Sequence, residues 1–102
     1  MRNIIYDSDI IKNFYDETRQ KIKENTVTKK NFKSQQKKIN KAIRTAVSLG
    51  SSSVIIVFYQ PTKETDIIYD LIHNIVDKGY EIHQQIISTF DTTKFIFTIS
   101  WD

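Results

Sequence analysis

The side chains that most often do chemistry in proteins are few in this sequence and lie far apart. His73 and His83 are its only histidines, and no cysteine is present to join them in a metal site. The missing cysteine also excludes disulfides, thiolate catalysis and most zinc sites. No HExxH spacing surrounds either histidine. We therefore predict no catalytic residue, no metal ligand and no cofactor, and expect surface or half-buried structural roles for both imidazoles.

Acidic side chains are scattered along residues 63–81, where they favour a solvated helix face. Two of them, Glu64 and Asp66, come near the start of a predicted helix, where the helix dipole stabilises negative charge. A paired-carboxylate site would need these groups to converge in a cleft, which a sequence does not show. The acids are Glu64, Asp66, Asp70, Asp77 and Glu81.

The segment 50–53, Gly-Ser-Ser-Ser, superficially resembles a phosphate-binding loop. It runs from a predicted helix into a predicted strand, whereas phosphate loops run from strand to helix so that the helix N-terminus meets the anion. The GK[ST] ending is also missing. We reject a nucleotide site here.

Charge is strongly segregated along the chain. The segment 25–63 contains eight Lys or Arg and no acid, whereas the remaining residues contain seven bases and all twelve acids. The local balances of +8 and −5 give the net charge of +3. Such a distribution makes a dipolar molecule with a basic surface.

The basic residues of the predicted helix 29–49 fall on one face. At 100° per residue, they occupy a sector of about 80° that extends for about 21 Å. We define this set as the basic stripe and predict that it is the partner-binding site: Lys30, Lys33, Lys37, Lys41 and Arg44. The opposite face is apolar and should pack on a sheet: Phe32, Ile39, Ala42, Ile43 and Ala46.

Three interpretations of the basic stripe stay open. It is a solvated lysine-rich face, a contact for an acidic protein surface such as the acid-rich end of another copy, or a contact for nucleic-acid phosphates. Like charges at i,i+4 repel, so a purely structural surface would alternate signs. Against nucleic acid, the stripe has no interleaved aromatic residues for base stacking, and lysine predominates over arginine.

Length and composition indicate one domain spanning residues 1–102. A hydrophobic content of 39% is ordinary for a globular protein. The longest apolar run, residues 54–59, is far short of the ~20 residues of a membrane span. Because the N-terminus turns acidic at Asp7, we expect no signal peptide, and we expect the chain to work in a reducing interior or inside a particle built there.

The hydrophobic periodicity predicts three helices and three strands. Helices are expected over residues 8–24, 29–49 and 63–78, with Asp7 or Ser8 capping the first and Thr28 the second. Pro61 and Thr62 should open the third helix, whose stripe includes Val76, and glycines 50 and 79 should end the second and third helices. Strands are expected over 54–59, 80–88 and 94–101, with a turn through residues 91–93.

These elements define an α+β fold of order ααβαββ, in which the βαββ unit spans residues 53–101. We prefer a three-stranded sheet of order 2-3-1, packed by helices on one face, with the first two strands parallel in sense. The uniformly apolar first strand indicates burial on both faces or a central place. Phe95, Phe97, Ile99 and Trp101 should form the floor of the core. Two free sheet edges would remain for a neighbouring chain.

A loose pattern runs through residues 39–101, in which small residues and a glycine precede an apolar strand, a helix ends in Gly-Tyr, and the last strand ends in Ile-Ser-Trp. Its residues are Ala42, Ala46, Gly50, 54–58, Leu71, Gly79, Tyr80, Ile99, Ser100 and Trp101. In this pattern the segment resembles small, mostly uncharacterised or virion-associated proteins of tailed bacteriophages and giant DNA viruses. The resemblance implies a minor virion component, located in the virion or the host cytoplasm, and transfers no site residue.

Together with the basic stripe, this resemblance predicts a non-enzymatic viral structural or accessory protein. Its partner would be a larger viral structural protein or a second copy, bound through the basic helix and a sheet edge. Sequence-nonspecific nucleic-acid binding through the same helix is the alternative. No membrane and no small-molecule substrate are expected.

Overall fold

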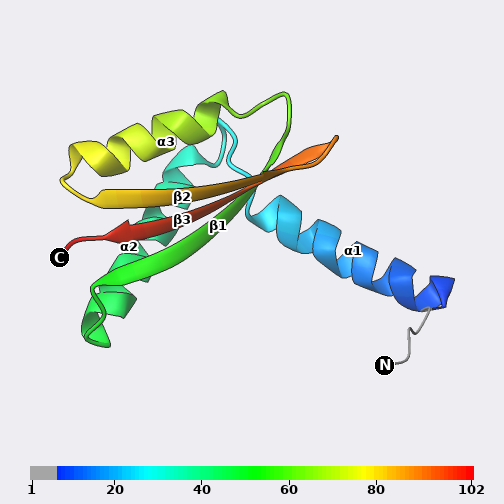
Figure 1. Cartoon of the computed structure of the whole chain (residues 1–102), viewed down its shortest axis with the longest axis horizontal. Coiled ribbons are helices and arrows are strands. Elements are labelled where there is room, and N and C mark those ends of the chain that lie inside the picture. The colour runs from blue at the N-terminus through cyan, green and yellow to red at the C-terminus, as the bar shows by residue number, and fades with distance from the viewer. Residues whose placement is uncertain (1–6) are drawn as a thin grey trace.

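The computed structural model describes residues 7–102, which form three helices and one three-stranded sheet (Figure 1). The helices are α1 (Ser8–Glu24), α2 (Phe32–Ser48) and α3 (Asp66–Asp77). The strands are β1 (Ser53–Pro61), β2 (Glu81–Ser88) and β3 (Thr92–Ser100). Residues 1–6 lie outside this range, and the expectation that the N-terminus is no signal peptide concerns them.

The sheet has the order β1-β3-β2, which confirms the α+β class and the central place of the last strand. β3 pairs antiparallel with both neighbours, so β1 and β2 run in the same direction, as predicted. Opposite residues share a face in antiparallel pairs. The pairing of Phe95 with Phe58 and Ile86 therefore identifies the face on which the core forms.

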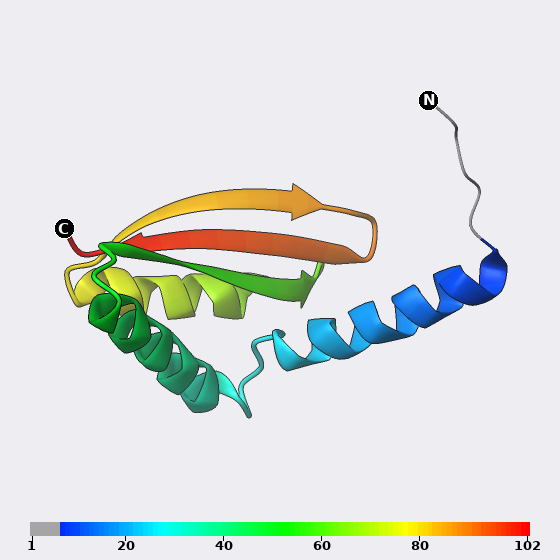
Figure 2. The ribbon, with the colours of Figure 1, turned by 90° about the horizontal axis from the view of Figure 1, so that it is seen from below.

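The core lies between that face and helices α2 and α3, which both lie beneath the sheet in Figure 2. β3 alternates strictly between buried and half-buried residues, and Phe95, Phe97 and Ile99 are almost fully buried. Phe95 and Phe97 stack with ring centroids 5.8 Å apart. Trp101 packs at the rim of the core and meets Tyr80 edge-to-face. The predicted floor of the core is confirmed.

The expectation for β1 was wrong, because within the described residues this strand pairs with β3 alone and has one open face. Its apolar residues at even positions, such as Phe58, enter the core, whereas Ile55 faces away and is 66% exposed. A uniformly apolar strand therefore does not mark burial on both faces here.

The boundaries at Pro61 and at the β2–β3 turn also differ from the prediction. Pro61 ends β1 instead of opening α3, because an edge strand tolerates a residue without an N–H at its end. The N-cap of α3 is then Thr65, and Val76 at the far end of that helix is exposed.

The β2–β3 turn uses residues 89–91, earlier than predicted, because Thr89 donates to the Thr92 carbonyl through its N–H and its hydroxyl.

Helix α1 has the predicted bounds but not the predicted packing. None of its residues is buried, and it projects past the hairpin end of the sheet (Figures 1 and 2). Asp7 occupies its N-cap position without a side-chain hydrogen bond, contrary to the expected cap. Three helices therefore do not cover one face of the sheet; two do.

Candidate partner-binding surface

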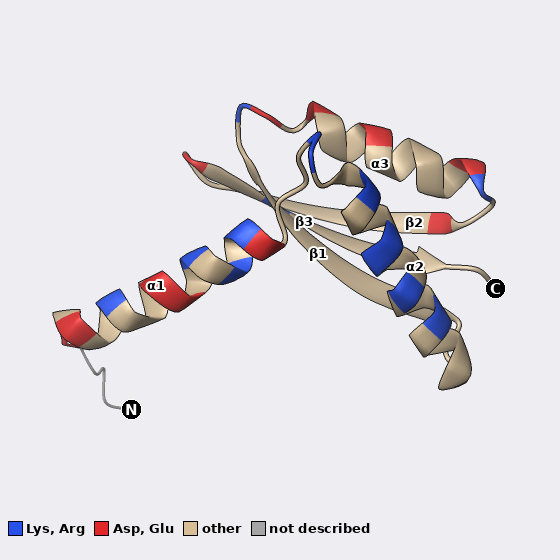
Figure 3. Cartoon of the chain, turned by 180° about the vertical axis from the view of Figure 1, so that it is seen from behind, with Lys and Arg blue, Asp and Glu red and all other residues tan. Residues whose placement is uncertain are grey.

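The basic stripe lies on the outer side of α2 and of the turn before it, and all five of its members are exposed. Figure 3 shows Lys and Arg following one another along the length of α2, with no acid between them. The opposite side of the helix is held in the core by Ile39 and Ile43, with Ala46 also buried. Because α2 is fixed on the sheet, the cations form one continuous outward row.

The first member of the stripe is not helical, which corrects the predicted start of α2. Thr28 and Asn31 exchange hydrogen bonds: the Thr28 N–H donates to Asn31 Oδ1 at 2.7 Å, and the Asn31 N–H donates to Thr28 Oγ1 at 3.2 Å. This reciprocal pair closes a turn over residues 28–31, so the helix begins only at Phe32. Lys30 lies in the turn, and the other four cations lie on the helix.

The other end of α2 stops as predicted at Gly50, which has φ +79°. The Ser51 N–H donates to the Ala46 carbonyl and the Gly50 N–H to the Val47 carbonyl, the pattern of a Schellman motif. After this motif the chain turns directly into β1. The side chain of Leu49, just before the turn, is 78% exposed. The segment 50–53 is therefore a helix stop.

Two hollows lie along α2 and the free edge of β1, and we call them together the edge groove. The larger has a volume of about 680 Å³ and the smaller about 350 Å³. Both hollows are lined by Lys38, Ala42 and Ile55, so the two hollows adjoin each other along β1. Lys41 and Leu49 are among the other residues that line the larger hollow. The groove thus has an apolar floor and ammonium groups on its helix side.

Lys38 is a binding candidate that the predicted stripe omitted. It lies about 100° around the helix from Lys37, on the side of α2 that faces β1. Its Nζ donates to the Glu24 carbonyl at 3.3 Å, which ties α2 to the end of α1. Only the position of β1 beside α2 reveals this role.

The free edge of β1 already forms one backbone hydrogen bond with a residue that belongs to no strand. The Tyr59 N–H donates to the Asn25 carbonyl at 3.0 Å, outside the sheet. Because outward N–H groups recur at every second residue of an edge strand, those of Ile55 and Val57 point the same way. An extended segment in the edge groove can continue the row that Asn25 begins.

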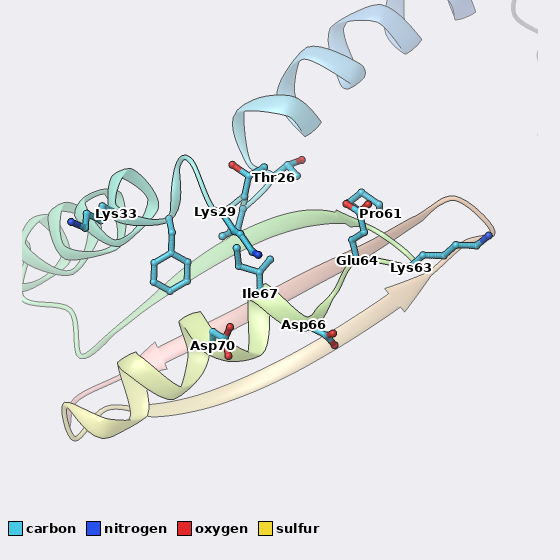
Figure 4. Close-up of a pocket in the computed structure, with 12 residues that line it drawn as sticks. Thr26, Lys29, Lys33, Pro61, Lys63, Glu64, Asp66, Ile67 and Asp70 are labelled. Carbon is cyan, nitrogen blue, oxygen red and sulfur yellow. The ribbon is translucent and has the colours of Figure 1, made fainter.

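A second concavity, of about 730 Å³, separates the start of α2 from the start of α3 (Figure 4). Its apolar lining includes Phe32 and Ile67, and its rim carries charges of both signs. In Figure 4, Lys29 reaches over Ile67, and Lys33 points away at one end of the cleft. The charged rim residues are Lys29, Lys33, Lys63, Glu64, Asp66 and Asp70.

This mixed cleft brings three predicted solvated acids beside the cationic segment, but it forms no recognisable catalytic set. All five acids of residues 64–81 are exposed, as predicted. His73 and His83 are exposed as well, and neither lines the cleft. Among residues 7–102, no group of three His, Cys, Asp or Glu side chains is placed to hold a metal ion.

Gln60 connects the elements that form these surfaces, and no pattern in the sequence predicts this role. Its side chain is almost fully buried and bonds both backbone groups of Val27, accepting from the N–H at 2.7 Å and donating to the carbonyl at 3.0 Å. It also donates to the Glu64 carbonyl. One amide therefore fixes the entry to α2 and the entry to α3 against β1.

Comparisons with protein-family models, with curated proteins and with solved structures found no match to this chain. In the part of the chain that the structure describes, no helix combines the length and the apolar character that crossing a bilayer requires.

Proposed function

We propose that this chain is a non-enzymatic binding protein that holds an acidic, extended protein segment in the edge groove. The observation that carries the proposal is the juxtaposition of two features. A row of cations free of acids runs along α2, and the free edge of β1 lies beside it across an apolar hollow lined by Lys38, Lys41 and Ile55.

The two features suit one kind of ligand. A β-strand added to the edge of β1 would receive main-chain hydrogen bonds. Its alternate side chains would turn toward α2, where carboxylates meet ammonium groups. Opposite charges steer association and select partners more than they add affinity. The ligand we infer is therefore a strand that alternates acidic and apolar residues.

The resemblance of residues 39–101 to small phage and giant-virus proteins supports a place for this activity in a virus. We propose a minor virion component or accessory factor whose acidic partner is a larger structural protein. Mass spectrometry of purified particles tests this placement: the chain should be found there in a reproducible copy number, and its absence would remove the virion role.

The binding proposal is tested with a fluorescein-labelled peptide of sixteen alternating Glu and Val residues, followed by fluorescence anisotropy. We expect saturable binding that weakens as NaCl is raised. The variant K37E/K38E/K41E should bind at least about tenfold more weakly, since each exposed ion pair contributes up to about 1 kcal/mol.

The matched control is K12E/K23E/K78E, which makes the same charge change at exposed lysines of α1 and at the end of α3. It should bind as the unmodified chain does. A second probe, the same peptide N-methylated at every residue, has no backbone N–H on either edge and so cannot form the ladder of an added strand. Equal binding of both peptides would remove the β1 edge from the model.

Nucleic-acid binding is the second candidate, favoured by the absence of any acid from the cationic row. Neutralised phosphates release counterions, so affinity would fall steeply with salt and depend little on sequence. A 20-nucleotide DNA, single-stranded or duplex, is titrated under the same conditions. Tight DNA binding combined with no peptide binding would replace the first proposal by this one.

A further inference from the structure

Helix α1 carries an apolar stripe that no described part of the chain covers. Its four large apolar residues at the outer end are 42–60% exposed: Ile10, Ile11, Phe14 and Tyr15. The polar side of the same helix mixes signs and is suited to water. An isolated helix of 17 residues is only marginally stable, because most helical stability in proteins comes from packing one apolar face. We therefore expect the stripe of α1 to pack against a partner surface.

The sheet offers a surface of the same kind. Helices α2 and α3 cover one face, and the strand register places an apolar group on the other: Ile55 and Val57 of β1, Ile96 and Thr98 of β3, and Ile87 of β2. Tyr59, His83, Gln85 and Lys94 lie on the same face around this group. Ile55 is 66% and Ile87 47% exposed. We call this surface the open sheet face. No described element lies on it (Figure 2).

The start of α2 prevents α1 from covering its own sheet. The Glu24 carbonyl accepts hydrogen bonds from Gln35 Nε2 at 3.2 Å and from Lys38 Nζ at 3.3 Å. The next carbonyl, of Asn25, accepts the N–H of Tyr59 at the sheet edge. These bonds fix the direction in which α1 leaves the body, away from the open sheet face of the same chain.

We propose that two copies of this chain exchange their first helices, so that the apolar stripe of α1 in each lies across the open sheet face of the other. Each copy supplies one helix and one face, so the contact closes on two chains with twofold symmetry. The open sheet face shares Ile55 and Val57 with the edge groove, whereas the apolar stripe of α1 and the β2 side of the sheet lie outside it.

The surface involved is sufficient for a stable dimer. From the exposed fractions above, and ~150–250 Å² for a fully buried large side chain, the stripe offers roughly 400 Å² and the open sheet face a somewhat smaller area. Two such contacts bury on the order of 1,500 Å², the size of a standard protein interface. A single contact between two α1 helices would bury about half as much and leave both sheets uncovered.

Cysteine cross-linking tests the exchange directly, because the chain contains no cysteine of its own. Thr18 lies one turn after Phe14, at the centre of the angular sector that the stripe occupies, and Thr98 lies on the central strand of the open sheet face. We expect an equimolar mixture of T18C and T98C to form, on mild oxidation, a disulfide-linked dimer that neither variant forms alone. Q20C, about 160° around α1 from Thr18, should not cross-link to T98C.

Sedimentation equilibrium of the unmodified chain should give twice the mass of one copy. Cross-linking of T18C with itself would show pairing between α1 helices and overturn the proposal. An intramolecular disulfide in T18C/T98C, with a monomeric mass, would show closure on the same chain and also overturn it. Neither Thr18 nor Thr98 lines the edge groove, so the cross-linking variants change no residue that the peptide titration tests.

Discussion

Gln60 is the single side chain on which the arrangement of the edge groove and the mixed cleft most depends. It reaches 33 residues back along the chain and satisfies both the N–H and the carbonyl of Val27. Buried backbone groups need such partners, because leaving one unpaired costs about 1–3 kcal/mol. The amide thus substitutes for a strand pairing that the loop before α2 does not have.

Replacing Gln60 by Leu keeps the volume but leaves the two backbone groups of Val27 without a partner. We expect the free energy of unfolding to fall by about 2 kcal/mol. Urea denaturation followed by far-UV circular dichroism measures it. Gln84→Leu, at an exposed position on β2, is the control and should change the free energy by less than about 0.5 kcal/mol. A similarly small effect at Gln60 would show that water replaces the amide.

At the scale of elements, α2 combines good packing with poor surface electrostatics. Lys33, Lys37 and Lys41 follow at four-residue intervals, so each neighbouring pair repels across one turn. A surface shaped by stability alone would place an acid at the middle position. The retained repulsion is therefore consistent with a stripe kept for its contacts.

Lys37→Glu converts both repulsions into i,i+4 attractions with Lys33 and Lys41. We expect the free energy of unfolding to rise by about 0.5–1 kcal/mol in low salt and the gain to shrink in high salt. Binding of the acidic peptide should weaken in the same variant. Lys63→Glu, in the loop before α3 and without helical neighbours, controls for net charge. A destabilised Lys37→Glu variant would indicate an unrecognised partner of Lys37.

The elements themselves were largely predictable, because their signals are local. Periodicity fixed α1 at residues 8–24, and the strict alternation of β3 identified the core face before any pairing was known. The start of α2 escaped prediction because Asn31, three residues after Thr28, competes for the same backbone groups. Apolar content alone did not reveal that β1 lies at an edge, since edge and central strands can share one composition.

The binding surface was predictable only in part. The basic stripe follows from helical geometry, and four of its five members lie on the helix as expected. Lys38 and the edge groove depend on where β1 lies relative to α2, and Gln60 depends on a contact across 33 residues. The apolar stripe of α1 indicates that this face of the helix packs against another surface. It does not indicate whether that surface belongs to the same chain or to a second copy.

At the scale of the whole molecule, the chain is more extended than its length requires. Its radius of gyration is 16.1 Å, against about 13 Å for a compact domain of this size. The difference arises from α1, which lengthens the longest axis to 47 Å and contributes no buried residue. The hydrophobic core itself runs from Val27 to Trp101. An extended monomer with two uncovered apolar faces is the expected shape of one half of an assembly.

If two copies of the chain exchange α1, their thermal stability must depend on protein concentration, because unfolding of a dimer releases two chains. A hundredfold increase in concentration, above the dissociation constant, stabilises each chain by about 1.4 kcal/mol and should raise Tm by about 5–10 °C. Phe14→Asp, in the apolar stripe, should give a lower Tm that no longer changes with concentration.

The control for this measurement is Val76→Asp, an exposed apolar position near the end of α3 that lies in neither proposed contact. Its Tm should keep the full dependence on concentration, even if its absolute value shifts. Because charge at Phe14 removes apolar burial without touching the core, the folded monomer should keep its far-UV spectrum. A Tm independent of concentration in the unmodified chain would mean that α1 remains uncovered, and the exchanged dimer would have to be abandoned.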